Sequence, residues 1–363
     1  MSVFWNNRTK NLSPYIPGEQ PKDRQFIKLN TNENPYPPSP KVIEAIKKTA
    51  NERLRLYPDP ECSELRETIA RRYNVKPEQV FASNSSDEIL AFAFGAFFES
   101  GQKDNESAVL FPDITYSFYP VYAKLWDIPY RTIPLCSDFS INAADYKVSS
   151  GGIILPNPNA PTGIALPIDY ILSLAEFLEK EKKVFIVDEA YIAFSGGSGA
   201  QSVIPYIYKY PNLLAVHTLS KEASLAGLRV GFAIGNEKLI EGLCRIRDSF
   251  NSYTLDRLAL AGAAAAIADA QYYDTINCLV CATRQRVTQA LRDLGFDVLP
   301  SSANFVFVKA PNISGADFFA ALRERGILVR HFKQDRIADF LRVSIGTDEE
   351  MDKFLVACRE IIK

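Results

Sequence analysis

The stretch LLAVHTLSKEASLAGLRVGFAI, residues 213–234, holds two short apolar runs on either side of a polar segment. The runs 213–218 and 230–234 have the length and the aliphatic and aromatic content of buried strands. Lys221 lies just past the first run, and Arg229 lies directly before the second. Lysines are frequent on exposed helices, so this stretch alone does not separate a functional lysine from a surface one.

Similar apolar runs alternate with helical patterns over much of the chain. The runs predict strands at 79–82, 107–111, 129–133, 151–155 and 184–187. Helical periodicity predicts helices at 39–53, 63–73, 116–125 and 167–181, and one that starts at Ser86 or Asp87. This alternation predicts an α/β fold in which helices cover both faces of a mainly parallel sheet. Ligands of such folds bind at loops beyond the strand ends.

The pattern changes after about residue 236, where long helical segments run to Leu294 with no strand between them. Apolar runs in FDVL and NFVFVKA and a helix at 314–325 then predict a smaller α+β unit. The first residues, rich in Pro, Asn and Gly, predict an extended arm. We therefore expect three parts, which are an N-terminal arm at 1–35, a large domain at 36–260 and a small α+β domain at 261–363.

Composition argues against several classes of protein. The chain has 363 residues, 47% of them hydrophobic and 23% charged, and its net charge of -2 gives no reason to expect a nucleic-acid partner. The longest apolar runs, such as 89–98, are too short to span a bilayer. The N-terminus lacks the apolar core of a signal peptide. Six cysteines in so long a chain favour reduced thiols, so we expect a cytoplasmic protein without a membrane partner.

Cys278 and Cys281 form a C-x-x-C pair that is compatible with a redox or zinc site. No second pair exists, and His217 and His331 lie far away in the sequence. The segment also has the pattern of a helix interior. We therefore expect buried structural cysteines and no metal site.

Three further motifs lie at predicted strand ends. VFIVDEAY, 184–191, ends a strand at Asp188 and places Tyr191 three residues later. SNSSDE, 83–88, precedes a helix whose free N–H groups are suited to bind phosphate. LPNPNAPTG, 155–163, forms a rigid loop. Taken singly, each has an ordinary structural explanation as a cap or a turn.

Taken together, these residues match the needs of pyridoxal phosphate. A lysine held away from bulk water near other cations has a lowered pKa and acts as a nucleophilic amine. Arg229 can neutralise a phosphate with its fork of donors. A buried Asp keeps the pyridine nitrogen protonated, and hydroxyl or amide donors hold the ring oxygen.

The chain resembles the fold-type-I, class II aminotransferases that use pyridoxal 5'-phosphate. The resemblance rests on motifs that occur in family order over almost the whole chain: PYIPG, NTNENPYPPSP, YPDP, NSSDEIL, NPNAPTG, VDEAY, TLSKEASLAGLRVG, GILVRHF and LRVSIGTDEE. It implies a sheet of seven strands between helices and a smaller C-terminal α+β domain. The resemblance is strongest to the branch that acts on histidinol phosphate.

The resemblance also implies roles around the cofactor. Lys221 would hold it and move a proton at the reacting carbon, Asp188 would face the pyridine nitrogen, and Tyr191 the ring oxygen. Tyr116 would stack on the ring. The phosphate would be surrounded by Ser85, Ser86, Asp87, Thr218, Ser220 and Arg229.

Other implied roles concern the substrate and a second subunit. Arg342 and Arg330 would bind the anionic group of the substrate, and Tyr15 would close over it. Tyr57 would reach the cofactor phosphate of the neighbouring subunit, which implies a homodimer.

Two motifs depart from the family pattern. The asparagine that normally donates to the ring oxygen is Ala160 here, and we expect neighbouring Asn159 to serve instead. Both glycines of the usual phosphate motif are serines, Ser83 and Ser85, at positions where the backbone can require angles that suit glycine.

The expected reaction is a ping-pong transamination that links histidinol phosphate and 2-oxoglutarate to imidazole acetol phosphate and glutamate. Both amino donors carry an anionic group that an arginine can hold bidentately. An aromatic-amino-acid aminotransferase and a threonine-phosphate decarboxylase share the same cofactor residues and stay open as alternatives. A regulator built on this scaffold is disfavoured because only about 35 residues precede the first predicted helix.

Overall fold

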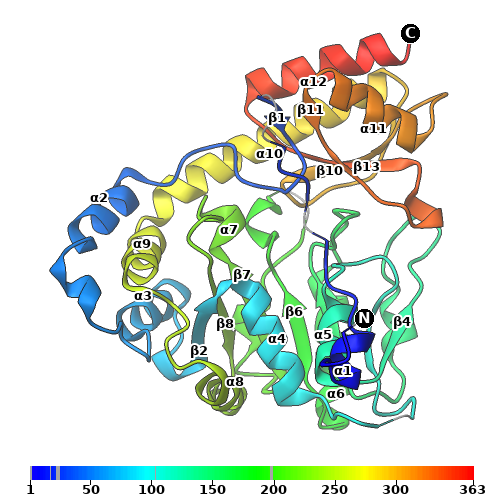
Figure 1. Cartoon of the computed structure of the whole chain (residues 1–363). Helices are drawn as coiled ribbons and strands as arrows, with labels where there is room; N and C mark the ends of the chain where they lie inside the picture. The colour runs from blue at the N-terminus through cyan, green and yellow to red at the C-terminus, as the bar shows by residue number, and fades with distance from the viewer. Residues whose placement is uncertain (1, 17, 22–24, 103, 197–198) are drawn as a thin grey trace.

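A sheet of seven strands runs through the centre of the computed structural model, which describes residues 2–363 except 17, 22–24, 103 and 197–198 (Figure 1). The spatial order is β2-β8-β7-β6-β5-β3-β4. The strands are β2 (Val80–Asn84), β3 (Val109–Pro112), β4 (Tyr130–Ile133), β5 (Gly152–Pro156), β6 (Phe185–Asp188), β7 (Leu213–Thr218) and β8 (Val230–Gly235). Strand β8 is antiparallel to both of its neighbours, and the pairs from β7 to β4 are parallel. The predicted mainly parallel sheet is confirmed.

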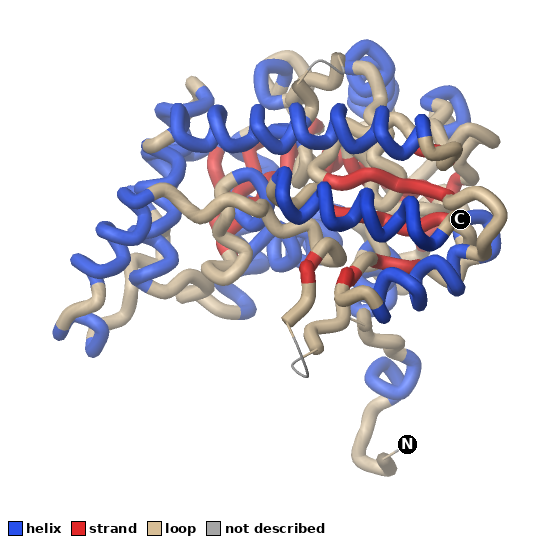
Figure 2. The backbone as a smooth tube through the Cα atoms, turned by 90° about the horizontal axis from the view of Figure 1, so that it is seen from above, coloured by secondary structure: helices blue, strands red, loops and turns tan. Residues whose placement is uncertain are grey.

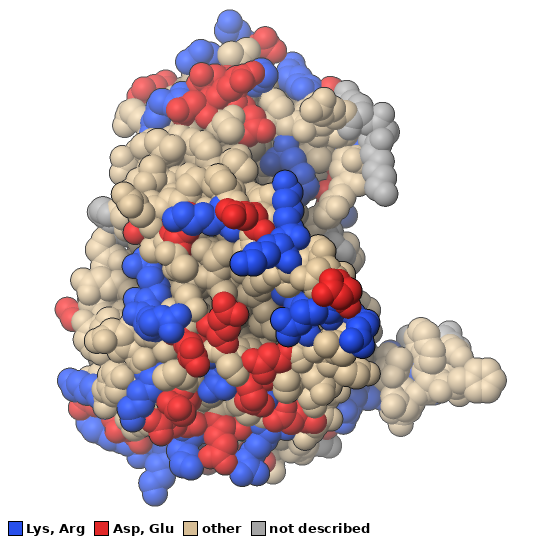
Figure 3. All heavy atoms as spheres, turned by 90° about the vertical axis from the view of Figure 1, so that its left-hand side faces the viewer, with Lys and Arg blue, Asp and Glu red and all other residues tan. Residues whose placement is uncertain are grey.

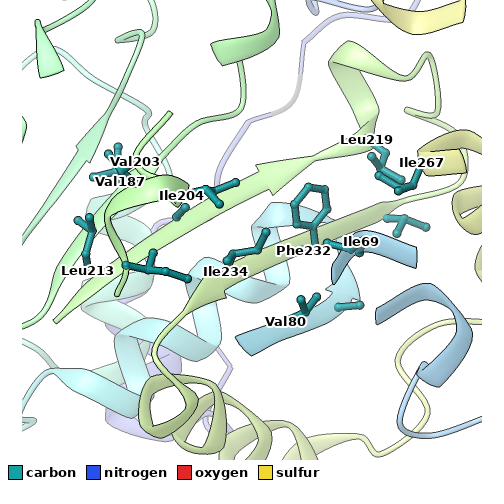
Figure 4. Close-up of a cluster of buried hydrophobic side chains, with 14 of the residues drawn as sticks. Ile69, Val80, Val187, Val203, Ile204, Leu213, Leu219, Phe232, Ile234 and Ile267 are labelled. Atoms are coloured by element: carbon teal, nitrogen blue, oxygen red, sulfur yellow. The ribbon is translucent and has the colours of Figure 1, made fainter. Parts of the chain in front are cut away.

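Both faces of the sheet are buried from β2 to β3, where alternate residues of each strand belong to different hydrophobic clusters, whereas the edge strand β4 is partly exposed. In β8, Phe232 and Ile234 point to one cluster and Ala233 to the other. The first face is covered by α2 (Pro40–Thr49), α3 (Ser63–Tyr73), α6 (Ile168–Lys180) and α9 (Arg257–Ala268). The second is covered by α4 (Ser85–Phe97), α5 (Tyr119–Trp126) and α8 (Glu237–Phe250). Figure 4 shows the first cluster, in which Phe232 and Ile234 lie among aliphatic side chains from the sheet and its helices.

Helix α6 illustrates why these segments are helical. Its buried residues, Ile171, Leu174, Ala175 and Leu178, follow the spacing of one helix face. That face packs against the sheet, and the opposite face carries the charged side chains of the helix.

A second layer is formed by the C-terminal part of the chain. Its antiparallel sheet has the order β12 (Arg330–His331), β13 (Phe340–Ser344), β10 (Phe305–Lys309) and β9 (Asp297–Val298). The helices α10 (Ala270–Asp293), α11 (Gly315–Glu324) and α12 (Asp348–Ile361) pack with it around a separate hydrophobic cluster. Figure 1 shows α10, in yellow, running from the side of α9 to this sheet.

The N-terminal segment joins the two layers. Strand β1 (Ile27–Lys28) pairs in parallel with β11 (Ile327–Leu328), and Leu29 is buried in the C-terminal cluster. The arm, predicted as extended, also contains the short helix α1 (Asn7–Asn11), which Figure 2 shows projecting from the body near the N-terminus. The domain limits at residues 35 and 260 stay predictions.

Several predicted limits differ from the structure for local reasons. Helix α5 begins at Tyr119 instead of 116, with Pro120 in its first turn, where a missing N–H costs little. Helix α2 ends at Thr49, and Asn51 caps a separate 3₁₀ turn, η1 (Glu52–Arg55). Helix α4 begins at Ser85, one residue before the earliest predicted start.

The prediction that both cysteines of the C-x-x-C pair are buried was wrong for one of them. Cys278 is exposed on α10, and Cys281 is partly buried and donates to the carbonyl of Phe194 at 3.2 Å. Residues three apart on a helix lie only about 60° apart around its axis, so this pair lies at the border of the buried face, with Cys281 on the inner side and Cys278 on the outer side. The described residues contain no group of three possible metal ligands.

Surface charge is mixed on the side of the molecule that carries α2 and α3. Figure 3 shows acidic and basic side chains interspersed there. Pairs such as Lys41–Asp269 at 2.6 Å and Arg72–Asp274 at 3.5 Å contribute to this mixture. Among the described residues, no helix is long and apolar enough to cross a membrane.

Candidate active site

A cavity of about 260 Å³ lies where β2, β5, β6 and β7 end and the N-terminal segment passes. It is lined by all but three of the predicted site residues: Tyr15, Ser85, Ser86, Asp87, Tyr116, Asp188, Tyr191, Thr218, Ser220, Lys221, Arg229 and Arg342. These residues come from parts of the chain more than 300 positions apart in sequence. The fold therefore gathers most of the predicted set into one place.

Lys221 lies in the short helix α7 (Leu219–Glu222), directly after β7. The hydroxyl of Thr218 accepts from the N–H of Ser220 and so caps this turn. The Lys221 Nζ donates to the carbonyl of Thr31 at 2.9 Å. Burial, and after it the positive charge of Arg342, lowers the pKa of Lys221 to about 8. A substantial fraction of this amine is therefore neutral near physiological pH.

Asp188 is buried at the end of β6, where the parallel strands open into the cavity. Its Oδ2 accepts from the hydroxyl of Tyr119 at 3.0 Å, and its Oδ1 accepts from the N–H of Ala190 at 3.2 Å. Burial raises the pKa of Asp188 to about 6, and these two hydrogen bonds oppose the rise. The carboxylate is thus mostly ionised at neutral pH, and a cation entering the cavity would stabilise it further.

The N-terminus of α4 forms one wall of the cavity with the buried residues Ser85 and Ser86. Ser85 has a left-handed backbone with φ of 69°, which costs roughly 1–2 kcal/mol outside glycine. Ser83 lies instead in the extended strand β2, and its hydroxyl donates to the carboxylate of Glu88. Of the two serines that replace glycine, only Ser85 therefore has a backbone for which glycine is better suited.

Asp87 organises the side chains beside this helix terminus. Its Oδ2 accepts from Arg229 Nη2 at 2.7 Å, and its Oδ1 accepts from the hydroxyl of Tyr116 at 2.6 Å. Arg229 Nη1 also donates to the hydroxyl of Ser220 at 3.4 Å. A fixed guanidinium, hydroxyls and free N–H groups together form a seat for an anion.

Gly231 makes this arrangement possible. A Cβ at this position would lie 2.4 Å from the backbone nitrogen of Ser86 and 2.6 Å from the backbone carbon of Ser85. Strand β8 can therefore approach the start of α4 this closely only because residue 231 has no side chain.

Tyr191 and Arg342 also line the cavity. The Tyr191 hydroxyl accepts from Asn32 Nδ2 at 2.9 Å, and burial raises its pKa. Arg342 Nη2 donates to the carbonyl of Asn30 at 3.0 Å, and its guanidinium lies 5.4 Å from the ring centre of Phe305. Its Nε is buried and has no hydrogen-bond partner among the residues that the structure describes. Arg342 therefore retains a donor.

Three predicted residues do not line the cavity. Asn159 is buried within the loop that follows β5, and its Nδ2 donates to the carbonyl of Ile114 at 3.0 Å and to the hydroxyl of Thr162 at 3.1 Å. Arg330 pairs with Arg342 across β12 and β13 and donates to the carbonyl of Ile16 at 3.4 Å. Tyr57 is 78% exposed and stacks on Tyr253 with ring centres 4.6 Å apart.

The expected substitution of Asn159 for the missing asparagine is thus not supported by the structure. Both donors of its amide are engaged within the loop and its neighbours, and the residue that reaches the cavity is Ala160. The side chain of Asn159 cannot leave these partners without leaving a buried carbonyl unpaired.

The sequence did not point to three cavity neighbours, which are Tyr119, Thr31 and Asn32. Tyr119 is buried, and no motif separates it from the other aromatic residues of that segment. Asn32 and Thr31 belong to the motif NTNENPYPPSP, which supports the family resemblance but points to no role for either residue. Only the three-dimensional path of the arm reveals their contacts with Tyr191 and Lys221.

A second, larger cavity of about 440 Å³ lies on the other side of α7. Its walls include Tyr73, His217 and Glu222. His217 Nε2 lies 2.8 Å from the carboxylate of Glu189, and burial raises the pKa of Glu222. None of the predicted site residues lines this cavity.

Comparison with known proteins gives one consistent result. The family model described as aminotransferase class I and II matches residues 24–357. The histidinol-phosphate aminotransferase of Clostridium acetobutylicum is 52% identical over 362 residues, with 100% of both chains covered. Histidinol-phosphate aminotransferase 1 of Bradyrhizobium diazoefficiens is also 52% identical over 362 residues, again with 100% of both covered.

A solved structure agrees in fold. The histidinol-phosphate aminotransferase from Sinorhizobium meliloti, in complex with pyridoxal-5'-phosphate, superposes with a TM-score of 0.87. The alignment covers 100% of this chain and 98% of that chain at 24% sequence identity. At this level of identity the likeness concerns the fold alone.

Proposed function

The chain belongs to the class I and II aminotransferases, and from that membership we propose that it is the pyridoxal-phosphate-dependent aminotransferase of histidinol phosphate. The family predicted from the motifs is confirmed by the match over residues 24–357. The proposed reaction exchanges an amino group between histidinol phosphate and 2-oxoglutarate, a step of histidine biosynthesis. The observation that carries it is full-length sequence identity of about 50% to histidinol-phosphate aminotransferases.

Pyridoxal 5'-phosphate fits the residues that line the cavity. An amine with a lowered pKa, an anion seat at the start of α4 and a buried carboxylate lie around one space. The close approach of Gly231 to Ser86 shapes the anion seat. When bound, the cofactor supplies an electron sink that allows bonds at the substrate α-carbon to break.

Lys221 is proposed to hold the cofactor and to carry the proton at the α-carbon. Its lowered pKa supports both tasks, because a neutral amine is a nucleophile and a base. The hydrogen bond from Nζ to the carbonyl of Thr31 fixes the side chain within the cavity.

The phosphate of the cofactor is proposed to bind at the start of α4. Ser85 and Ser86 offer N–H groups and hydroxyls, and Thr218, Ser220 and Arg229 complete the seat. Asp87 would hold Arg229 and Tyr116 in place from behind through its two carboxylate oxygens. Tyr116 is proposed to stack on the cofactor ring.

Asp188 and Tyr191 are proposed to set the electronic state of the ring. A carboxylate within a buried site stabilises a protonated pyridine nitrogen, and the proposed salt bridge would lower the pKa of Asp188 from its raised value. Tyr191 would donate its hydroxyl proton to the ring oxygen. The proximity of both side chains to Lys221 in one cavity supports these assignments.

Substrate anions are proposed to bind Arg342, with Arg330 adding positive charge from the neighbouring strand. A phosphate monoester and a carboxylate are both suited to the fork of a guanidinium. Tyr15, which stacks on Phe118 with ring centres 4.3 Å apart, would close over the substrate from the arm. One arginine would then serve both half-reactions.

A homodimer is also part of the proposal. Tyr57 is exposed together with nearby apolar residues: Leu54, Leu56, Phe250 and Tyr253. Exposed apolar surface of this kind is typical of protein interfaces. Tyr57 would reach the cofactor phosphate of the partner subunit.

We also propose a cytoplasmic location, with which the six free cysteines are compatible.

Steady-state specificity tests the proposed substrate. The purified enzyme, supplied with cofactor and 2-oxoglutarate, should use histidinol phosphate with kcat/KM far above that for phenylalanine or tyrosine. A preference for phenylalanine would assign aromatic transamination instead. Release of carbon dioxide from threonine phosphate, without transamination, would assign the decarboxylase.

A further inference from the structure

The loop that follows β5 supplies no side-chain amide to the cavity. Asn157 exchanges two hydrogen bonds with the backbone of Leu166, at 3.2 and 2.8 Å. Asn159 donates to Ile114 and Thr162. Pro156 and Ala160 are the loop residues that line the cavity. A ring oxygen bound near Tyr191 would therefore receive no amide donor from this loop.

A different asparagine lies beside Tyr191. Asn32 lines the cavity, is 1% exposed and donates from Nδ2 to the Tyr191 hydroxyl at 2.9 Å. It comes from the N-terminal segment, 159 positions away in sequence. We propose that Asn32 is a positioning residue that aims the hydroxyl proton of Tyr191 into the cavity. This assignment rests on the proposed function, since the hydroxyl would donate to the ring oxygen of the cofactor.

The orientation of the Asn32 amide is fixed by its neighbours. The hydroxyl of Ser344 accepts from the backbone N–H of Asn32 at 2.8 Å and donates to its Oδ1 at 2.9 Å. The backbone carbonyl of Asn32 accepts from Asn304 Nδ2 at 2.9 Å. With Oδ1 engaged, the NH₂ group faces Tyr191. Asparagine also tolerates the left-handed backbone at this position, where φ is 58°.

The consequence for Tyr191 follows from hydrogen-bond donors and acceptors. An amide NH₂ can only donate, so the Tyr191 oxygen accepts from it, and the tyrosine's own proton is free for another acceptor. A residue that could accept would instead draw that proton away from the cavity. Asn32 would thus act on the cofactor through Tyr191. It would strengthen the hydrogen bond from the Tyr191 hydroxyl to the ring oxygen, at a site where the loop presents Ala160 and no amide donor.

A double-mutant cycle tests this role. In Asn32→Ala, the dissociation constant of pyridoxal phosphate should rise about five- to tenfold, as expected for one lost buried hydrogen bond. The pH midpoint of the cofactor's visible absorbance should also rise, because a weaker donor leaves more negative charge on the ring oxygen. In a Tyr191→Phe background, the same Asn32→Ala change should alter the dissociation constant less than twofold and leave the pH midpoint almost unchanged. Equal effects in both backgrounds would overturn the proposal, since they would indicate a purely structural role.

Two further variants keep the test decisive if Asn32→Ala folds poorly. Asn32→Asp keeps the shape and places an acceptor beside Tyr191, so it should also raise the absorbance midpoint. Adding an amide to the loop with Ala160→Asn should restore part of the affinity lost in Asn32→Ala. An unchanged midpoint in Asn32→Asp would contradict the inference.

The control variant is Asn30→Ala. Asn30 belongs to the same segment but does not line the cavity, and its side-chain amide donates to the carbonyl of Glu19. The absorbance midpoint of Asn30→Ala should match that of the wild type, and a shift as large as that of Asn32→Ala would reject a specific role for Asn32. The visible absorbance of the wild-type enzyme with cofactor distinguishes failure of this inference from failure of the proposed function. No visible cofactor band in the wild type would refute the function, whereas a normal band that Asn32→Ala leaves unchanged would refute only the positioning role.

Discussion

Lys221 illustrates how function and stability oppose each other at a single residue. Its pKa of about 8 in the folded chain lies below the ordinary value of 10.5, so the folded state disfavours the charged amine. The unfolded state then binds more protons between these two pH values, and stability rises with pH across that window. Below about pH 8 the buried amine is charged, and its full destabilising effect on the folded state is present.

Replacing Lys221 with methionine should therefore stabilise the cofactor-free protein. At pH 7, removal of the buried charge should raise the free energy of unfolding by roughly 3 kcal/mol, and loss of the hydrogen bond to Thr31 should lower it by about 1 kcal/mol. We expect a higher free energy of unfolding for Lys221→Met at pH 7, with the difference shrinking between pH 8 and 10.5. Denaturant titrations at several pH values measure it, and a constant difference over this window would contradict the assigned pKa.

Tyr119 provides a test of the environment of Asp188. Its hydroxyl lowers the pKa of Asp188, which burial raises to about 6. Removing the hydroxyl in Tyr119→Phe should raise that pKa further. Protonation of Asp188, and with it the loss of cofactor affinity on lowering the pH, should then begin at a higher pH than in the wild type. The dissociation constant of pyridoxal phosphate, measured by protein fluorescence from pH 5 to 8, reports the shift. An inflection that stays in place or moves to lower pH would disprove the expected coupling.

At the residue scale, candidate residues could be selected from the sequence where chemistry restricts the residue type, and their roles stay proposals. A lysine, an aspartate and an arginine at strand ends are few enough to be singled out, and Lys221, Asp188 and Arg229 do line one cavity. Selection from the sequence failed for Asn159, because an amide one position from the usual one points to different partners. Tyr119 could not be singled out, because a buried tyrosine resembles any core aromatic residue until its partner is known.

At the scale of elements, the contact between β8 and α4 shapes the anion seat. The backbone of Gly231 approaches that of Ser86 so closely that no Cβ fits. The sequence shows the glycine but not its neighbour, because the two segments are 145 positions apart. Strand positions, in contrast, were predictable because doubly buried strands read as continuous apolar runs.

Gly231→Ala should displace the start of α4 and weaken cofactor binding at least tenfold. Overpacking of this kind costs about 1–3 kcal/mol of stability. Gly227→Ala is the matched control, since an added Cβ there meets no atom within 4 Å. Equilibrium binding of pyridoxal phosphate to both variants compares them. Equal affinities for Gly231→Ala and Gly227→Ala would show that this contact does not shape the phosphate site.

Helix limits were less predictable than helix positions. The start of α5 moved by three residues because the turn before it holds Tyr116 beside Asp87. The C-x-x-C pair of α10 was predicted to be buried because its segment has the pattern of a helix interior, although Cys278 is exposed. Which face of a helix is buried depends on its neighbours, and the neighbours of α10 come from both layers of the molecule.

At the scale of the whole molecule, the cavity depends on three distant parts of the chain. The N-terminal segment contributes Thr31 and Asn32, the central sheet and the helix that follows β7 contribute Asp188 and Lys221, and the C-terminal sheet contributes Arg342. The alternation of strands and helices was sufficient to predict the α/β architecture. The path of the arm was not predictable, because distant side chains such as Lys221 and Arg342 donate to its backbone carbonyls, and such contacts leave no periodic pattern in the sequence.

Mixed subunits test the proposed dimer. If Tyr57 acts on the partner subunit's site, a heterodimer of Tyr57→Ala and Lys221→Ala chains contains one intact site, although each homodimer is impaired. Random pairing of equal amounts should therefore restore about one quarter of wild-type activity per subunit. Coexpressed, differently tagged chains allow the heterodimer to be isolated and assayed. Activity no greater than the sum of the two homodimers would place Tyr57 within its own subunit's site or outside any site.

The most direct test of the central claim is one half-reaction, followed by absorbance after rapid mixing without a keto acid. Wild-type enzyme loaded with pyridoxal phosphate should be converted by histidinol phosphate to the pyridoxamine form in a single fast phase, much faster than by phenylalanine. Lys221→Ala, mixed in the same way, should show no such conversion. Rapid conversion of the Lys221→Ala variant, or a wild type that responds to phenylalanine and not to histidinol phosphate, would contradict the account.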